Sequence, residues 1–267
     1  MRKIGIGITT YNRPDYLKQC LEHISKNIKS VDFLVVYNDA SDIKHHDMYK
    51  VALSKIESHP VHPDKFIYIV SAQNRGVAHA KNRLLEELID KGCTDLFLLE
   101  DDILLLDDKA VTEYIRICEE YGFEHAMFAH HGDANKSALI YGDNDVEYYN
   151  ACVGAWCYYT RNAIEKLREL EEKQGLAYPG FFDENFKNAW EHVEHTKRLG
   201  DAGFTGWWGM FVDIKNSKQY ISEIEGSIDN SSIRPNTGWK QNQIDGLAYW
   251  EKKWGVKPDI QLGSDQA

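Results

Sequence analysis

Residues 96–102 read Leu-Phe-Leu-Leu-Glu-Asp-Asp, an apolar run that ends abruptly in three acidic side chains. A short apolar run bounded by polar residues is typical of a strand that is buried on both faces of a sheet. Three earlier runs have the same form and also end in polar residues, namely 3–10, 31–37 and 66–70. Because helical patterns separate these runs, the sequence predicts an α/β fold with a mostly parallel sheet.

The helical patterns between and after these strands complete the expected order of elements. Pro14 lies where a helix can begin, and Leu17, Leu21 and Ile24 then share one helical face. The remaining elements that we expect are helices at 77–89, 161–173, 184–199 and 243–254, strands at 126–129, 152–159 and 210–214 (the last strand), and a long loop at 217–239.

Composition and charge narrow the classes of protein to consider. The chain has 267 residues, 43% of them hydrophobic, and a formal net charge of −11. An acidic chain without a basic stripe is a poor partner for nucleic acid. No run approaches the roughly 20 apolar residues of a transmembrane helix, and the first residues lack the apolar stretch of a signal peptide. We therefore expect a cytoplasmic protein, with peripheral membrane association left open.

The five cysteines do not suggest a disulfide framework or a zinc knuckle. They are scattered, odd in number and contain no Cys-x-x-Cys pair. Reduced thiols are the simpler interpretation for a cytoplasmic chain.

The acidic triplet Glu100-Asp101-Asp102 is the strongest chemical signal in the chain. Acidic residues at such a point can also belong to a helix N-terminus or a solvated turn. Carboxylate oxygens suit hard cations, so the triplet predicts a site for Mn²⁺ or Mg²⁺. Such a cation would offset the repulsion between an acidic protein and a diphosphate ligand, and it would stabilise the charge on a departing phosphate.

Polar clusters follow the other three predicted strands, at the edge where open α/β sheets bind ligands. The cluster at 9–14 offers backbone amides, an aromatic ring and a cation near a helix N-terminus, which suits phosphate or a base. Asp39 could accept a hydrogen bond from a uracil or a ribose, or it could cap the next helix. Lys81 could reach a nucleotide or lie on a solvated helix face. The candidate nucleotide-sugar-binding residues are Thr9, Tyr11, Asn12, Arg13, Asp39, Ser41, Asn74, Gly76, Lys81 and Asp101.

Together the four clusters resemble the family 2 glycosyltransferases. Residues 8–14 (Ile-Thr-Thr-Tyr-Asn-Arg-Pro), 38–42 and 74–82 look like the nucleotide-binding motifs of that family, and 100–102 lies where the family has its Asp-x-Asp metal motif. The resemblance implies a GT-A fold, a three-layer α/β/α sandwich, and inverting transfer from a nucleotide diphosphate sugar, a UDP-sugar by analogy. One departure is Glu100 in place of the first Asp, so the resemblance places more weight on Asp102 as the metal ligand beside Glu100.

The resemblance also suggests an organisation for the whole chain. We expect one GT-A domain over 1–267, with a nucleotide-sugar half at 1–105, an acceptor half at 106–216 and a C-terminal loop and helix at 217–267. The acceptor would be a hydroxyl of a saccharide, a lipid-linked molecule or a protein.

A second motif in the acceptor half predicts the catalytic base. Asp183-Glu184 and the later Glu191-His192 resemble a family signature whose Glu-Asp pair lies beside the acceptor and supplies the base. His192 occupies the usual Asp position, so Glu191 and His192 remain nearly equal candidates, ahead of Asp183. His192 and His195 would share a helical face, but no third zinc ligand is indicated.

Trp207 and Trp208 lie between two glycines, and one of them could form the floor of the acceptor site. Most tryptophans, however, serve packing.

Two other functions compete with this one. A sugar nucleotidylyltransferase would need a glycine-rich N-terminal loop with an activating Arg and Lys, and residues 4–11 do not provide one. A non-catalytic carbohydrate- or nucleotide-binding protein on the same scaffold would not need Glu100, Asp102 and Glu191. The sequence therefore predicts a metal-dependent glycosyltransferase.

Overall fold

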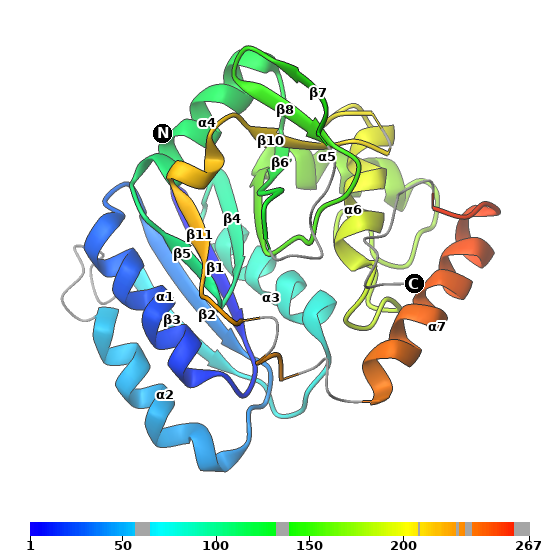
Figure 1. Ribbon diagram of the computed structural model, residues 1–267. Coiled ribbons are helices and arrows are strands. Elements are labelled where there is room, and N and C mark those ends of the chain that lie inside the picture. The colour runs from blue at the N-terminus through cyan, green and yellow to red at the C-terminus, as the bar shows by residue number, and fades with distance from the viewer. Residues whose placement is uncertain (57–64, 132–138, 208, 228–229, 233–236, 259–267) are drawn as a thin grey trace.

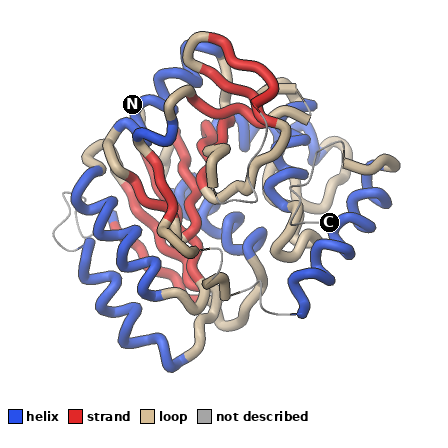
Figure 2. Tube along the Cα trace, viewed as in Figure 1, coloured by secondary structure: helices blue, strands red, loops and turns tan. Residues whose placement is uncertain are grey.

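The computed structural model describes residues 1–56, 65–131, 139–207, 209–227, 230–232 and 237–258. Its central sheet has the strand order β3-β2-β1-β4-β9-β6 (Figures 1 and 2). Neighbours from β3 to β4 run parallel, whereas β9 runs antiparallel to both β4 and β6. The strands are β1 (Ile4–Thr10), β2 (Phe33–Asn38), β3 (Phe66–Val70), β4 (Asp95–Glu100), β6 (His125–Met127) and β9 (Trp156–Thr160). The expectation of a mostly parallel α/β sheet is confirmed.

Alternation along β4 explains the three layers. Leu96 and Leu98 belong to one buried cluster, and Phe97 and Leu99 belong to the other, because successive strand residues point to opposite faces. The first cluster is completed by residues of α3 (Val77–Asp90), α5 (Arg161–Glu172) and α6 (Glu191–Asp201), and the second by residues of α1 (Pro14–Asn27), α2 (His46–Leu53) and α4 (Lys109–Tyr121). Figure 1 shows α1 and α2 on the opposite side of the sheet from α3.

Smaller elements surround this sandwich. One antiparallel sheet has the order β10-β8-β7, and a strand pair joins β11 to β5. Their bounds are β5 (Ile103–Leu105), β7 (Leu139–Asp143), β8 (Val146–Tyr149), β10 (Phe211–Ile214) and β11 (Ile221–Glu223); the 3₁₀ turns are η1 (Ile43–His45), η2 (Ser54–Ile56) and η5 (Ser217–Gln219), and the last helix is α7 (Thr237–Trp254). Within the described residues, no helix is both long and apolar enough to cross a membrane.

Four expectations about the elements were wrong. The helix expected at 184–199 begins only at Glu191, because Asn188 and Trp190 have φ angles of 56° and 72° that no α-helix allows. The strand expected from 152 begins at Trp156, after Gly154 with φ of 66°. The loop expected at 217–239 contains η5 and β11, so β10 is not the last strand. Finally, α7 begins at Thr237 and not at residue 243.

Candidate functional site

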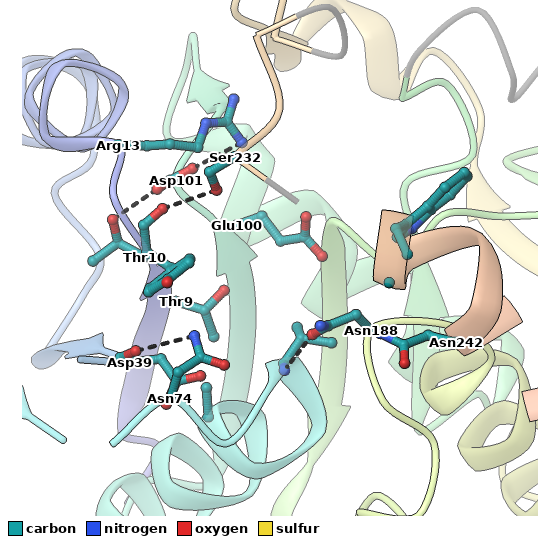
Figure 3. Close-up of a pocket in the computed structure, with 15 residues that line it drawn as sticks. Thr9, Thr10, Arg13, Asp39, Asn74, Glu100, Asp101, Asn188, Ser232 and Asn242 are labelled. Carbon is teal, nitrogen blue, oxygen red and sulfur yellow. Dashed lines mark hydrogen bonds and ion pairs between the residues drawn. The ribbon is translucent and has the colours of Figure 1, made fainter. Parts of the chain in front are cut away.

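The carboxyl ends of β1, β2 and β4 meet at one edge of the sheet. Thr10 is in register with Asn38 of β2, and Thr9 with Glu100 of β4, so the polar residues that follow these strands converge. They surround a cavity of about 260 Å³ (Figure 3). The residues that line it are Thr9, Thr10, Tyr11, Arg13, Asp39, Asn74, Val77, Ala80, Glu100, Asp101, Asn188, Ser232, Gly238, Trp239 and Asn242.

Asp39 lines the cavity and also holds the loop that leads into α3. Its carboxylate accepts hydrogen bonds from the backbone N–H groups of Arg75, at 3.0 Å, and Gly76, at 2.8 Å. Burial raises the pKa of Asp39, and these amides oppose that shift. Asn74 donates to the Asp39 carbonyl at 3.2 Å. The helix that Asp39 supports is therefore α3, and not the helix that follows it in the chain.

Asn12 and Ser41, both predicted to bind the nucleotide, are not among the described residues that line the cavity. The backbone N–H of Asn12 donates to Ser41 Oγ at 2.8 Å, and Asn12 Oδ1 accepts from the N–H of Asp42 at 2.7 Å. Ser41 also donates to the Tyr49 hydroxyl at 3.0 Å. These contacts join the loops after β1 and β2. Tyr11 and Arg13, the two neighbours of Asn12 in the chain, line the cavity.

Arg13 lies against the acidic triplet. Its Nη1 is 3.3 Å from Asp101 Oδ1 and 3.1 Å from Asp102 Oδ2, and Thr10 donates to Asp101 at 2.7 Å. Burial raises the pKa of Asp101, against the opposing effect of Arg13. Glu100 is the most exposed acid of the triplet, with 30% of its side chain accessible. It extends into the cavity in Figure 3.

The donor atoms at this site suit a hard cation. Asp102 is not among the described residues that line the cavity, but its Oδ1 is buried and makes no hydrogen bond with the described part of the chain. Within the described ranges, no group of three or more His, Cys, Asp or Glu side chains is arranged to hold a metal ion. A cation held by Glu100 and Asp102 would therefore need further oxygen ligands, which a diphosphate and water can provide.

Lys81 is fully buried and is not among the described residues that line the cavity. Its Nζ donates to the Gly154 carbonyl at 3.1 Å, and it lies 3.2 Å from Glu191 Oε1 and 3.5 Å from Glu100 Oε1. Burial lowers the pKa of Lys81, but the two carboxylates raise it more. The lysine therefore connects an acid of the triplet to a candidate base.

The three candidate bases differ in their contacts, and none is among the described residues that line the cavity. Burial alone would raise the pKa of Glu191, but Lys81 and His192 lower it to about 2. His192 has both ring nitrogens engaged, Nε2 donating to the Cys152 carbonyl at 2.8 Å and Nδ1 lying 3.3 Å from Glu191. Only Glu191 of the three contacts Lys81.

Asp183 lies away from this group and holds α7 in place. Its carboxylate accepts from Lys253 at 2.7 Å, from the Tyr249 hydroxyl at 2.9 Å and from the Asn185 side chain at 2.8 Å. Burial would raise its pKa, but these donors lower it overall. The side chain is therefore occupied by contacts with the last helix.

The tryptophan that lines this cavity belongs to α7, and Trp207, which the sequence suggested for the acceptor site, lies elsewhere. Trp207 is 80% exposed and lines a different, largely apolar cavity of about 530 Å³ together with Tyr141 and Tyr148. Trp208 lies outside the described residues. Trp239 and Asn242 of α7 line the first cavity instead. Their spacing of three residues places them on one helical face, a signal that the expected loop over 217–239 obscured.

Part of the chain matches a known protein family. Residues 6–124 match the family model named glycosyl transferase family 2. This segment holds every cavity residue from Thr9 to Asp101, but not Glu191 or Trp239. A comparison with curated proteins found no match.

Solved structures share the fold. The mannosyltransferase PcManGT from Pyrobaculum calidifontis, in complex with GDP-Man and Mn²⁺, has a TM-score of 0.51 and 15% identity over 76% of this chain and 53% of that chain. TarS from S. aureus has a TM-score of 0.55 and 10% identity over 96% of this chain and 44% of that one. GalNAc-T7 with UDP, GalNAc and Mn²⁺ has a TM-score of 0.53, 10% identity, and coverage of 76% and 41%. The chain thus has a GT-A glycosyltransferase fold and spans about half the length of these structures.

Proposed function

We propose that this protein is a glycosyltransferase that transfers a sugar from a nucleotide diphosphate donor, by analogy a UDP-sugar, to a hydroxyl acceptor with inversion. The observation that carries the proposal is the convergence of Arg13, Glu100 and Asp101 on one cavity at the carboxyl edge of the sheet, within the segment that matches the family. A cation and carboxylates beside backbone amides suit a metal-bound diphosphate.

The nucleotide would lie at the end of the cavity formed by Thr9, Tyr11, Asp39 and Asn74. Asp39 offers a carboxylate to the base or the ribose, and its position is fixed by the amides of the loop before α3. The Tyr11 ring can pack against a flat base.

Glu100 and the unpaired Asp102 Oδ1 would hold Mn²⁺ or Mg²⁺. When bound, such an ion neutralises the charge that develops on the leaving diphosphate. Arg13 supplies a second positive charge, beside Asp101 and Asp102. The solved structures of PcManGT and GalNAc-T7 contain Mn²⁺, which supports a hard cation in this fold.

Glu191 is the base in this proposal. Lys81 lowers its pKa and connects it to Glu100 at the cavity. A carboxylate with a low pKa can accept the acceptor's proton because the attacking hydroxyl becomes more acidic as its bond to the anomeric carbon forms. The acceptor oxygen would then attack that carbon while the diphosphate leaves on the opposite side, which inverts its configuration.

Asp102→Asn tests the core of the proposal. Transfer and donor hydrolysis would be measured on a panel of UDP- and GDP-sugars with Mn²⁺, for the wild type and for Asp47→Asn, whose side chain is 93% exposed on α2. We expect Asp102→Asn to lose activity on the order of a hundredfold, as for removal of one electrostatic group, while Asp47→Asn retains it. Full turnover by Asp102→Asn in EDTA would exclude the metal site, and nucleotide-sugar binding without turnover would indicate a binding protein.

A further inference from the structure

The cavity has two chemically different ends. Asp39 and Asn74 lie at one end, whereas Asn188 and Asn242 lie at the other, and the Glu100 side chain extends toward that second end (Figure 3). A ligand that spans the cavity would pass the acidic triplet on its way between them.

The second end is built from the start of α7. Gly238, Trp239 and Asn242 belong to its first two turns, and Ala80 of α3 contributes a small side chain to the same cavity. An indole ring provides an apolar face for the C–H groups of a pyranose, and side-chain amides both donate to and accept from hydroxyls. One aromatic face with a few polar groups is the chemistry of a saccharide site.

The rest of α7 fixes this end of the cavity in position. Trp190 Nε1 donates to the Gln243 carbonyl at 3.2 Å. The same indole packs against Gly246, where an added Cβ would come within 2.7 Å of the ring. Further along, Lys253 Nζ lies 2.7 Å from both Asp183 and Glu194. The first turns are therefore presented by a helix that is anchored along its length.

We propose that Trp239, Asn242 and Asn188 form the subsite for the sugar ring of the donor and so select which sugar is transferred, an inference that rests on the proposed function. The donor sugar follows the diphosphate, and in Figure 3 Glu100 lies between the nucleotide end and this subsite. Both ends belong to one cavity of about 260 Å³, so a single ligand can contact residues at both ends.

Calorimetric titration of Trp239→Ala tests the subsite without an activity assay. The probes are UDP, GDP, UDP-glucose, UDP-N-acetylglucosamine and GDP-mannose, each with Mn²⁺. We expect the wild type to bind one of the sugar conjugates more tightly than its parent nucleoside diphosphate. In Trp239→Ala, the affinity for that conjugate should fall about tenfold, the usual scale for truncating a contact tryptophan. The affinity for the parent diphosphate should stay the same. Trp239→Phe, which keeps an aromatic face, should retain most of the affinity for the conjugate.

Trp207→Ala is the matched control, since Trp207 is 80% exposed and lines the other cavity. An unchanged preference in Trp239→Ala, or an equal loss in Trp207→Ala, would overturn the subsite. So would a wild type that binds every conjugate no more tightly than its diphosphate. A wild type that binds neither UDP nor GDP would instead refute the proposed function, and the subsite with it.

Discussion

At the scale of single residues, the buried lysine decides what the neighbouring acids can do. Lys81 Nζ lies between Glu191 and Glu100, and it lowers the pKa of Glu191 against the effect of burial. A lysine that looks like a solvated or ligand-binding cation in the sequence therefore acts as the counter-ion of two carboxylates. Lys81 thus lowers the pKa of Glu191 and holds its carboxylate by an ion pair of 3.2 Å.

The assignment of the base follows from this arrangement. Glu191→Gln should lower kcat by about a hundredfold or more, the scale for loss of a general base, with a much smaller change in the donor KM. His192→Ala should keep kcat within about tenfold, because both ring nitrogens already have partners. Steady-state kinetics at saturating donor and acceptor would measure both. An inactive His192→Ala beside an active Glu191→Gln would reverse the assignment.

At the scale of elements, α7 connects the candidate acceptor half to the cavity. Asp183, a candidate base in the sequence, is instead the acceptor for Lys253 and Tyr249 of this helix. Trp250 is fully buried against Phe186 and Trp190. The helix thus has polar and apolar anchors on the segment that precedes α6.

Asp183→Asn should weaken this anchoring. The change leaves Lys253 with Glu194 as its remaining carboxylate, so we expect a loss of about 1–3 kcal/mol in the free energy of unfolding, the cost of one broken buried charged hydrogen bond. Urea unfolding would measure it, and hydrogen exchange should show faster opening of α7. Glu251→Gln, on the same helix but partly exposed, is the control. Equal stability of the two variants would show that α7 does not depend on Asp183.

At the scale of the whole molecule, the net charge of −11 opposes the binding of an anionic ligand. Arg13 is the cationic side chain among the described residues that line the cavity, and the proposed divalent cation would add a second positive charge. Binding should therefore depend on the metal.

Thermal unfolding tests this dependence. A ligand at 100 times its Kd stabilises the native state by about 2.7 kcal/mol, which corresponds to a rise in Tm of about 5 °C or more for a chain of this length. We expect UDP or GDP to give that rise with Mn²⁺ and to lose most of it in EDTA. The same shift in EDTA would mean that Arg13 and the backbone amides bind the diphosphate without a metal ion.

The parallel core and the edge at which the candidate site lies could be predicted from the sequence. Short apolar runs ending in polar clusters are local patterns, and the carboxyl ends of parallel strands must meet at one edge. For that reason Thr9, Asp39, Asn74 and Glu100 could be placed together before any coordinates were known.

Which polar residues face the cavity and which support it depends on long-range packing. Lys81, Asn12 and Ser41 have suitable chemistry but are engaged by neighbours from other segments. Trp239 lies more than a hundred residues after Glu100, yet both line one cavity. Contacts at such separation depend on how α6 and α7 pack, and no local period in the sequence records that packing.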